Sequence, residues 1–222
     1  MNLASYLDST NLKPQATQKD IAALCEEAAR LQMAAVCIHP CRLPQAQAIL
    51  PGTGVRLCTV IGFPLGAEGR NSKVFSAACA LEDGAEELDM VINLGALKDG
   101  DYGKVEEEVK SILKLKNDYS FILKVIVETA LLSHTELIAL TRMLGDCGAD
   151  FIKTSTGFSS RGASLEDIQI INAHRPAGLK IKAAGGIREL DFALQLIAAG
   201  ADRLGSSNAG RILEEYEVRG GR

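Results

Sequence analysis

The sequence predicts a single α/β domain, residues 1–222, folded as a (β/α)8 barrel, the TIM-barrel architecture. Eight short segments rich in apolar residues start roughly 20 to 35 residues apart, which is the spacing that a strand and its crossover helix require. Several of these segments are apolar almost throughout, as is typical of parallel strands covered on both faces. Eight such units in a chain of 222 residues fit one closed barrel.

The predicted strands are spread evenly along the chain. They cover residues 6–12, 34–39, 56–62, 87–92, 121–128, 151–155, 179–185 and 203–207. The first and last have the weakest patterns, and without them a doubly wound open sheet also fits the sequence. No linker rich in proline and serine divides the chain, so we expect one domain.

A short motif, Gly-Ala-acid followed by an apolar stretch, occurs three times, at Gly84, Gly148 and Gly200. A helix-like segment precedes each copy, and the glycine is suited to the left-handed residue that ends a helix. Ser133 and Glu136 have the spacing of a capping box at the start of the second of these helices. The run 103–118 is expected to be a solvated helix with an apolar stripe.

Composition excludes several classes of protein. The net charge of −4 argues against a general binder of nucleic acid or of membrane surfaces. No apolar run approaches the roughly 20 residues of a membrane span, and the N-terminal residues do not resemble a signal peptide. The six cysteines are scattered through apolar segments, so we expect free thiols and a cytoplasmic protein. The spacing in "CIHPC" (37–41) matches no common zinc pattern, and we expect no metal.

Ionisable residues stand near the ends of several predicted strands, where barrel enzymes place their chemistry. They are Asp89, Lys124, Lys153 and Lys182. A single lysine in such a place is usually a surface group with its stem along apolar atoms, and a single aspartate is usually a turn residue or helix cap. Lysines on neighbouring strands in Gly/Ser/Thr-rich surroundings indicate a site instead.

Two adjacent lysines have a specific chemical use. A lysine amine attacks a carbonyl only when it is neutral. A second ammonium at roughly 6 Å, with an effective dielectric near 20, costs about 2.8 kcal/mol and lowers the pKa by about two units. Asp89 is then suited to proton transfer. The residues themselves leave open whether Lys124, Lys153 or Lys182 forms the imine.

The last two strands end in "KAAGGIRE" and "LGSSN". Gly185, Gly186 and Gly205 allow backbone N–H groups to approach an anion, and Ser206 and Ser207 offer hydroxyls. A tight turn is the alternative for the Gly-Gly pair. Because loops after strands seven and eight are the usual phosphate site of this fold, we expect phosphate to bind here.

At this level of detail the sequence resembles the deoxyribose-phosphate aldolase family, class I aldolases with the (β/α)8 fold. The resemblance is carried by "LDSTNLKPQAT", "VCIHPC", "TVIGFPLGA", "EELDMVINLGALKDG", "LKVIVET", "GADFIKTSTGF", "KAAGGIR" and "ADRLGSS". These stretches run from residue 7 to about residue 207. The sequence departs from the family pattern at Ser9, at Ser76, where many relatives have an acid, and at Asn208, next to the last motif.

The resemblance implies reversible cleavage of 2-deoxy-D-ribose 5-phosphate to D-glyceraldehyde 3-phosphate and acetaldehyde. It implies that Lys153 forms the Schiff base, that Lys182 perturbs its pKa and that Asp89 relays protons. It further implies a set of substrate-binding residues: Asp8, Thr10, Cys37, Lys124, Thr156, Gly157, Gly185, Gly186, Arg188, Gly205, Ser206 and Ser207. It implies a phosphorylated sugar as substrate, neither metal nor organic cofactor, and a homodimer.

Three alternatives remain at this stage. They are an aldolase for a different sugar phosphate, a phosphate-binding epimerase or isomerase, and a catalytically inactive phosphate-binding protein. An epimerase would not need Lys153 and Lys182 together, and an inactive protein would not need to keep either lysine or Asp89. The three histidines, His39, His134 and His174, are too few and too scattered for the metal site of a class II aldolase.

Overall fold

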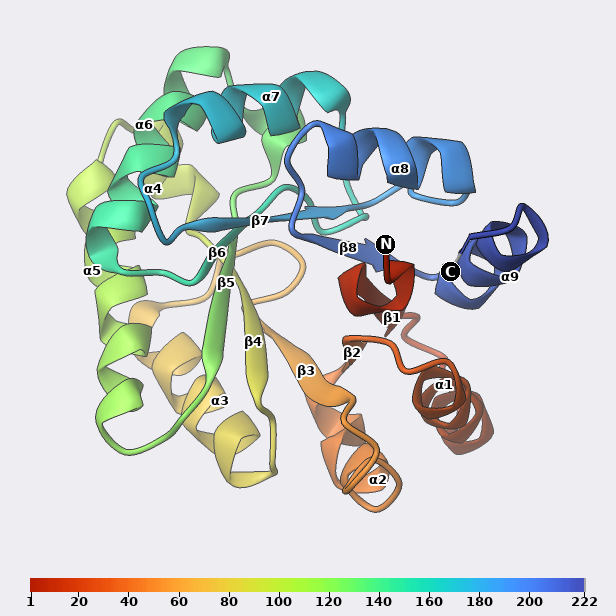
Figure 1. The fold of residues 1–222 in the computed structure, drawn as a ribbon. Coiled ribbons are helices and arrows are strands. Elements are labelled where there is room, and N and C mark those ends of the chain that lie inside the picture. The colour runs from red at the N-terminus through yellow and green to blue at the C-terminus, as the bar shows by residue number, and fades with distance from the viewer. Residues whose placement is uncertain (222) are drawn as a thin grey trace.

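The computed structural model describes residues 1–221 and confirms the predicted barrel (Figure 1). Eight parallel strands close in sequence order, with β1 paired to both β2 and β8. The strands are β1 (Leu7–Asn11), β2 (Ala35–Ile38), β3 (Arg56–Ile61), β4 (Glu87–Val91), β5 (Ile122–Ile126), β6 (Phe151–Lys153), β7 (Lys180–Ala184) and β8 (Arg203–Ser206). Each lies inside its predicted range. Closure between β1 and β8 excludes the open sheet.

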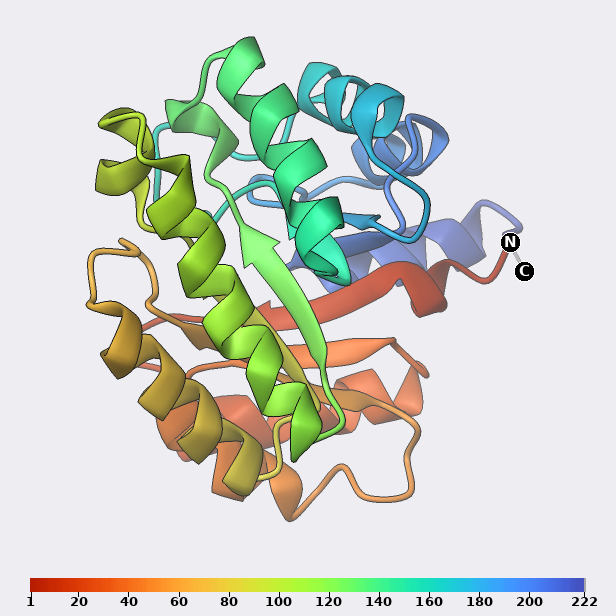
Figure 2. The same cartoon turned by 90° about the vertical axis from the view of Figure 1, so that its left-hand side faces the viewer.

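Helices surround the barrel and connect its strands (Figures 1 and 2). The α-helices are α1 (Gln18–Arg30), α2 (Leu43–Gln47), α3 (Arg70–Glu82), α4 (Leu94–Lys98), α5 (Tyr102–Leu113), α6 (His134–Cys147), α7 (Leu165–His174), α8 (Leu190–Ala198) and α9 (Ala209–Val218). Short 3-10 helices are η1 (Leu3–Tyr6), η2 (Pro40–Arg42), η3 (Lys114–Asn117) and η4 (Thr129–Leu131). No helix within residues 1–221 has the length and hydropathy to cross a membrane.

The predicted helix signals are confirmed at α6. Ser133 accepts from the backbone N–H of Glu136, and the Glu136 carboxylate accepts from the backbone N–H of Ser133, which completes the capping box. Gly148 ends the helix at φ +83°, in the left-handed region. The predicted helix over 103–118 is α5 followed by η3, and α5 buries one stripe of Val105, Val109 and Ile112.

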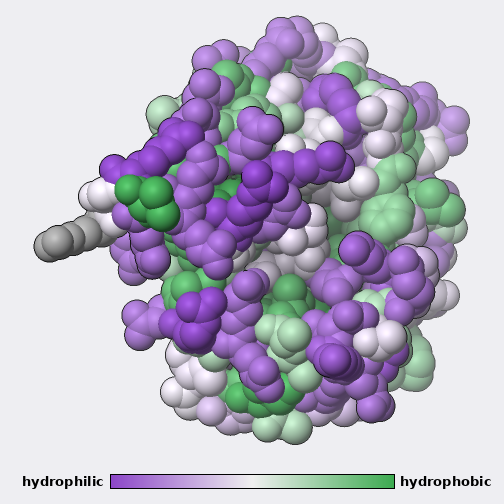
Figure 3. All heavy atoms as spheres, turned by 90° about the vertical axis from the view of Figure 1, so that its right-hand side faces the viewer, coloured by the Kyte–Doolittle hydropathy of each residue, from purple (hydrophilic) through white to green (hydrophobic). Residues whose placement is uncertain are grey.

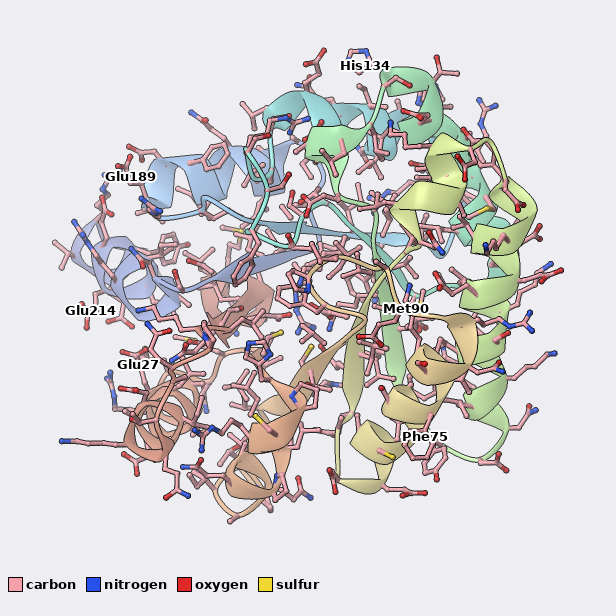
Figure 4. All side chains as sticks on the ribbon, turned by 180° about the vertical axis from the view of Figure 1, so that it is seen from behind. Glu27, Phe75, Met90, His134, Glu189 and Glu214 are labelled. Atoms are coloured by element: carbon pink, nitrogen blue, oxygen red, sulfur yellow. The ribbon has the colours of Figure 1, made fainter. Side chains whose placement is uncertain are left out.

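Alternate side chains of each strand point to opposite faces of the sheet, either into the barrel or outward toward the surrounding helices. Leu88 and Met90 belong to the large apolar core, whose remaining members come mainly from the outward faces of the strands and from the helices around them. Figure 4 shows Met90 inside the molecule, whereas Phe75 on α3 points outward. Hydrophilic residues cover most of the face in Figure 3, with apolar groups in separated patches. The inward-facing residues of the strands are left to build the site.

Candidate active site

Register brings the charges of distant strands together inside the barrel. Asp89 on β4 pairs with Lys124 on β5, Lys153 on β6 pairs with Lys182 on β7, and Lys182 pairs with Arg203 on β8. All lie on inward-facing positions, because alternate residues of a strand share one face. The convergence predicted from the strand ends is therefore present.

Asp89 is the centre of the cluster and contacts lysines from three strands. Lys124 donates to Oδ1 at 2.8 Å. Lys153 and Lys182 donate to Oδ2, at 2.6 and 2.7 Å. Asp89, Lys124 and Lys182 are fully buried, and Lys153 is 3% exposed. The four groups therefore interact electrostatically with one another, with little screening by bulk water.

Two of these lysines also belong to a closed ring of ion pairs. From Asp89 the ring passes through Lys182 to Asp8 (Nζ–Oδ2 2.5 Å) and from Asp8 to Arg203 (Nε–Oδ1 2.7 Å). It continues from Arg203 to Glu87 (3.2 Å), from Glu87 to Lys124 (2.6 Å), and back to Asp89. Cations and anions alternate around it. We call these residues the charge ring: Asp8, Glu87, Asp89, Lys124, Lys182 and Arg203.

Lys153 stands outside the charge ring, attached to it only through Asp89. The ring holds three carboxylates, and Lys124, Lys182 and Arg203 match them. Arg56, at 3.9 Å from Glu87, is half-exposed at the strand's first residue and is screened by solvent. Relative to the charge ring, Lys153 is therefore the surplus cation, and it can lose its charge without leaving a ring carboxylate unmatched.

The cations of the charge ring hold two of its acids, Asp89 and Asp8, ionised. Burial would raise the pKa of Asp89, but Lys124, Lys153 and Lys182 outweigh it and hold that pKa well below its usual value. In the same way, Lys182 and Arg203 outweigh burial and lower the pKa of Asp8. In each case the nearby opposite charge decides the protonation state.

The ring lysines are held charged by the same balance. Burial would lower the pKa of Lys182, but Asp8 and Asp89 raise it above its ordinary value. Burial acts in the same direction on Lys124, and Asp89 raises the pKa of Lys124 well above the ordinary value. Both therefore stay ammonium groups at neutral pH, so neither is a nucleophile in this state.

Two thiols contact the other side of Asp89. Cys58 donates to Oδ1 at 3.2 Å, and the sulfur of Cys37 lies 3.9 Å from Oδ2. Burial raises the pKa of Cys58, and its hydrogen bond with Cys37 lowers the pKa of Cys37. Within residues 1–221, Cys37, Cys58 and Asp89 form the group that could offer three ligands to a metal. A metal cation does not fit there, because Asp89 already binds three ammonium groups.

A cleft of about 350 Å³ opens above Lys153 at the carboxyl ends of the strands. Ten of the predicted site residues line it: Thr10, Lys153, Thr156, Gly157, Gly185, Gly186, Arg188, Gly205, Ser206 and Ser207. Five others do not: Asp8, Cys37, Asp89, Lys124 and Lys182 lie below it in the barrel interior. Of the three lysines on Asp89, Lys153 alone reaches the cleft.

The glycines around the cleft have separate structural reasons. Gly185 and Gly186 have φ of +83° and +75°, a left-handed conformation that glycine adopts without strain. Gly205 is different, since a Cβ there would lie 3.2 Å from Cε of Lys182. It leaves the space that the Lys182 side chain occupies, in addition to lining the cleft.

The two serine hydroxyls at the end of β8, those of Ser206 and Ser207, are not equivalent. The Ser206 hydroxyl donates to the Ile187 carbonyl at 2.6 Å and accepts from the backbone N–H of Asn208 at 2.9 Å, so its side chain is already engaged. Ser207 is exposed and lines the cleft. Asn208 is absent from the residues that line the cleft and precedes the first residue of α9, but its side-chain oxygen accepts from the Ser207 hydroxyl at 3.4 Å.

Sequence reasoning missed several residues. Lys13 and Phe158 line the cleft, and Arg203 and Glu87 complete the charge ring. A signal existed for Glu87, which stands two residues before Asp89 and thus on the same face of the strand. Lys13 directly follows a predicted strand and could have been found by the rule that identified the other lysines.

Comparison with known proteins adds an independent observation. A family model described as DeoC/LacD family aldolase matches residues 3–212. A deoxyribose-phosphate aldolase from Thermococcus gammatolerans is 47% identical over 216 residues, which are 96% of each chain. Another, from Macrococcus caseolyticus, is 44% identical and covers 99% of each chain.

Solved structures agree. One described as "QR15, an Aldolase" superimposes with a TM-score of 0.94 at 41% identity, covering 99% of this chain and 98% of the other. The deoxyribose phosphate aldolase of Aeropyrum pernix, described as having a unique tetrameric structure, gives 0.90 at 36% identity, covering 97% and 91%. Mandelate oxidase, at 15% identity and 0.64, shares the fold alone.

Proposed function

The chain belongs to the DeoC/LacD family of aldolases, and we propose that it reversibly cleaves 2-deoxy-D-ribose 5-phosphate to D-glyceraldehyde 3-phosphate and acetaldehyde. It is a lyase of the aldolase type. The relatives named above carry the same substrate in their names. We also propose that the reaction belongs to the breakdown of deoxyribose, because it consumes the phosphorylated form of this sugar.

The proposal is carried by one observation: Lys153 is the surplus cation on Asp89 and the one of the three lysines that reaches the cleft. An imine-forming lysine must lose a proton to attack and must touch the substrate. Lys124 and Lys182 meet neither requirement, because each is fully buried and each is matched by two carboxylates. Lys153 is therefore the proposed Schiff-base residue.

The chemistry proceeds in balanced steps. The neutral amine of Lys153 adds to C1 of the open-chain sugar, and uptake of one proton with loss of one water leaves a protonated imine. A base removes the proton of the C3 hydroxyl, the C2–C3 bond breaks, and its electron pair moves into the imine. Glyceraldehyde 3-phosphate departs and an enamine remains. Protonation at C2 and addition of water then release acetaldehyde and restore the amine.

Asp89 is placed to move protons in these steps, because its Oδ2 lies 2.6 Å from the Lys153 nitrogen. In the resting site three cations hold it ionised. When Lys153 becomes a neutral amine or an enamine, Asp89 loses one of its three cations and becomes a better proton acceptor. Lys182 keeps its charge throughout, since Asp8 and Asp89 both stabilise it.

The phosphate group is proposed to bind at the far end of the cleft, between the loops after β7 and β8. Gly185, Gly186 and Ser207 line the cleft there, and backbone N–H groups at glycines and a serine hydroxyl are suited to an anion. Lys13 and Arg188 line the same cleft and supply positive charge. This position leaves the aldehyde end of an open-chain sugar next to Lys153.

Reductive trapping tests the proposed function. The protein is incubated with deoxyribose 5-phosphate, reduced with borohydride and digested, and the modified peptide is located by mass. An adduct on Lys153 supports the mechanism. An adduct on Lys124 or Lys182 contradicts the assignment of Lys153 as the Schiff-base residue. If no adduct forms while a control aldolase is trapped in parallel, deoxyribose 5-phosphate is not the substrate.

Two further properties are proposed. The chain associates at least into a homodimer, supported by the tetrameric relative and by exposed Leu65, Phe75 and Val218. It acts in the cytoplasm, supported by six free cysteines. Sedimentation at micromolar concentration tests the first, and a monomer would contradict it. Cell fractionation tests the second.

A further inference from the structure

We propose that Arg203 and Glu87, at the floor of the barrel, are positioning residues that set the pH at which Lys153 becomes a nucleophile. The inference rests on the proposed function, in which Lys153 forms the imine. Neither residue lines the cleft. Both act through the charge ring, and they act in opposite directions.

The connection from Arg203 to the reacting nitrogen consists of close ion pairs. Arg203 contacts Asp8 through Nε at 2.7 Å and through a second nitrogen. Asp8 contacts Lys182, and Lys182 shares Oδ2 of Asp89 with Lys153. The guanidinium is 11% exposed and its partners are fully buried, so solvent screens these interactions weakly.

Glu87 connects to the same carboxylate from the other side. Its carboxylate lies 2.6 Å from Lys124 and 3.2 Å from Arg203. Lys124 in turn donates to Oδ1 of Asp89. Glu87 is fully buried, so its negative charge is matched by these contacts rather than by water.

The charged and titratable groups that are joined to Lys153 through Asp89 and the charge ring come from the seven remaining strands of the barrel. They are Asp8 (β1), Cys37 (β2), Cys58 (β3), Glu87 and Asp89 (β4), Lys124 (β5), Lys182 (β7) and Arg203 (β8). With both thiols uncharged, these groups sum to zero when Lys153 is neutral. Removal of one charge from the ring therefore unbalances the site, and Lys153 is the group able to respond.

The sign of each effect follows. Loss of Arg203 leaves an excess carboxylate, which favours the ammonium form of Lys153, so activity should require a higher pH. Loss of Glu87 leaves an excess cation, which favours the neutral amine, so activity should extend to lower pH. A unit charge removed at roughly 10 Å with an effective dielectric near 20 corresponds to about one pH unit.

The experiment measures the pH profile of kcat/KM for the full-length protein and four variants: Arg203→Met, Glu87→Gln, the double variant, and Arg203→Lys as the charge-conserving control. We expect the acidic limb to move up by about one unit in R203M and down by about one unit in E87Q. It should return toward the original position in the double variant and in R203K.

A merely structural role predicts a different result: lower activity without displaced limbs. The proposal is overturned if the acidic limbs of R203M and E87Q move in the same direction, or if neither limb moves. This holds for variants whose circular dichroism spectrum is intact. If R203M does not fold, the proposal is tested by E87Q alone: a downward shift of its acidic limb supports the proposal, and an unmoved limb refutes it. Borohydride trapping on each protein separates the two hypotheses. An adduct on Lys153 with unmoved profiles refutes only the role of the ring, whereas an adduct on another lysine refutes the assignment of Lys153, and the absence of any adduct refutes the proposed function.

Discussion

Lys153 and Lys182 donate hydrogen bonds to the same atom, Oδ2 of Asp89, at 2.6 and 2.7 Å. Their nitrogens are therefore closer together than the sum of these two distances. Two ammonium groups at such a separation repel each other, and the shared carboxylate offsets this repulsion. The two lysines differ in their partners. Lys182 has a second carboxylate, Asp8, whereas Asp89 is the one carboxylate that Lys153 contacts among the described residues.

Replacement of Lys153 by leucine should abolish turnover, because no imine can form. We expect kcat/KM to fall by roughly 10³-fold or more. The free energy of unfolding should stay within about 1 kcal/mol, since the charge ring remains matched. A coupled assay and urea unfolding measure the two quantities. Full activity in K153L would refute the mechanism.

Replacement of Lys182 by leucine should be both catalytically and structurally costly. Asp8 and Asp89 each lose a buried partner, which costs about 3–5 kcal/mol of stability. The pH optimum of the residual activity should move upward, because a positive charge beside Lys153 is gone. Urea unfolding of K182L and K153L in parallel provides the comparison. Equal stability of the two variants would contradict the charge ring.

Replacement of Arg188 or Lys13 by glutamine should weaken binding of the phosphate. We expect KM for deoxyribose 5-phosphate to rise about tenfold, with little change in kcat, because each side chain contributes a charge-assisted contact. Unphosphorylated deoxyribose is the control substrate, and its kcat/KM should not change. A parallel loss with both substrates would place these residues outside the phosphate site.

Stability should depend on pH through the acids of the ring. The pKa values of Asp8 and Asp89 are lowered in the folded state from an ordinary value of 3.8. Their contribution is therefore present above pH 3.8 and is lost as the pH falls through the folded-state values. The ring lysines have raised pKa values, so their contribution is present below 10.5 and is lost at higher pH.

Urea unfolding between pH 2 and 11 measures this dependence. Stability should be level between about pH 5 and 9 and should fall on both sides. Glu106→Gln, which removes the exposed partner of Lys110, should leave the curve unchanged. A curve that falls steadily through the neutral range would contradict the assigned protonation states.

Much of this protein could be predicted from local pattern. Each of the eight strands lies inside its predicted range, and the capping box at Ser133 and the glycine stop at Gly148 are confirmed. Spacing also indicated that Lys124, Lys153 and Lys182 converge, but it placed all three at the mouth of the barrel, whereas Lys153 alone lines the cleft and the other two lie buried below it. The confirmed features were predictable because hydrophobic periodicity, capping and turn residues are local properties of the chain.

The contacts between strands show which lysine lacks a second carboxylate partner, and no local pattern could have shown this. Asp8 and Arg203 stand at opposite ends of the chain, and they meet because β1 pairs with β8 when the barrel closes. Glu87 and Arg203 meet across its interior. Local pattern in the sequence predicted the order of the strands and helices and the types of residue at the site, and barrel closure was seen in the pairing of β1 with β8. The matching of charges, and with it the surplus position of Lys153, depends on distances between strands that no local pattern encodes.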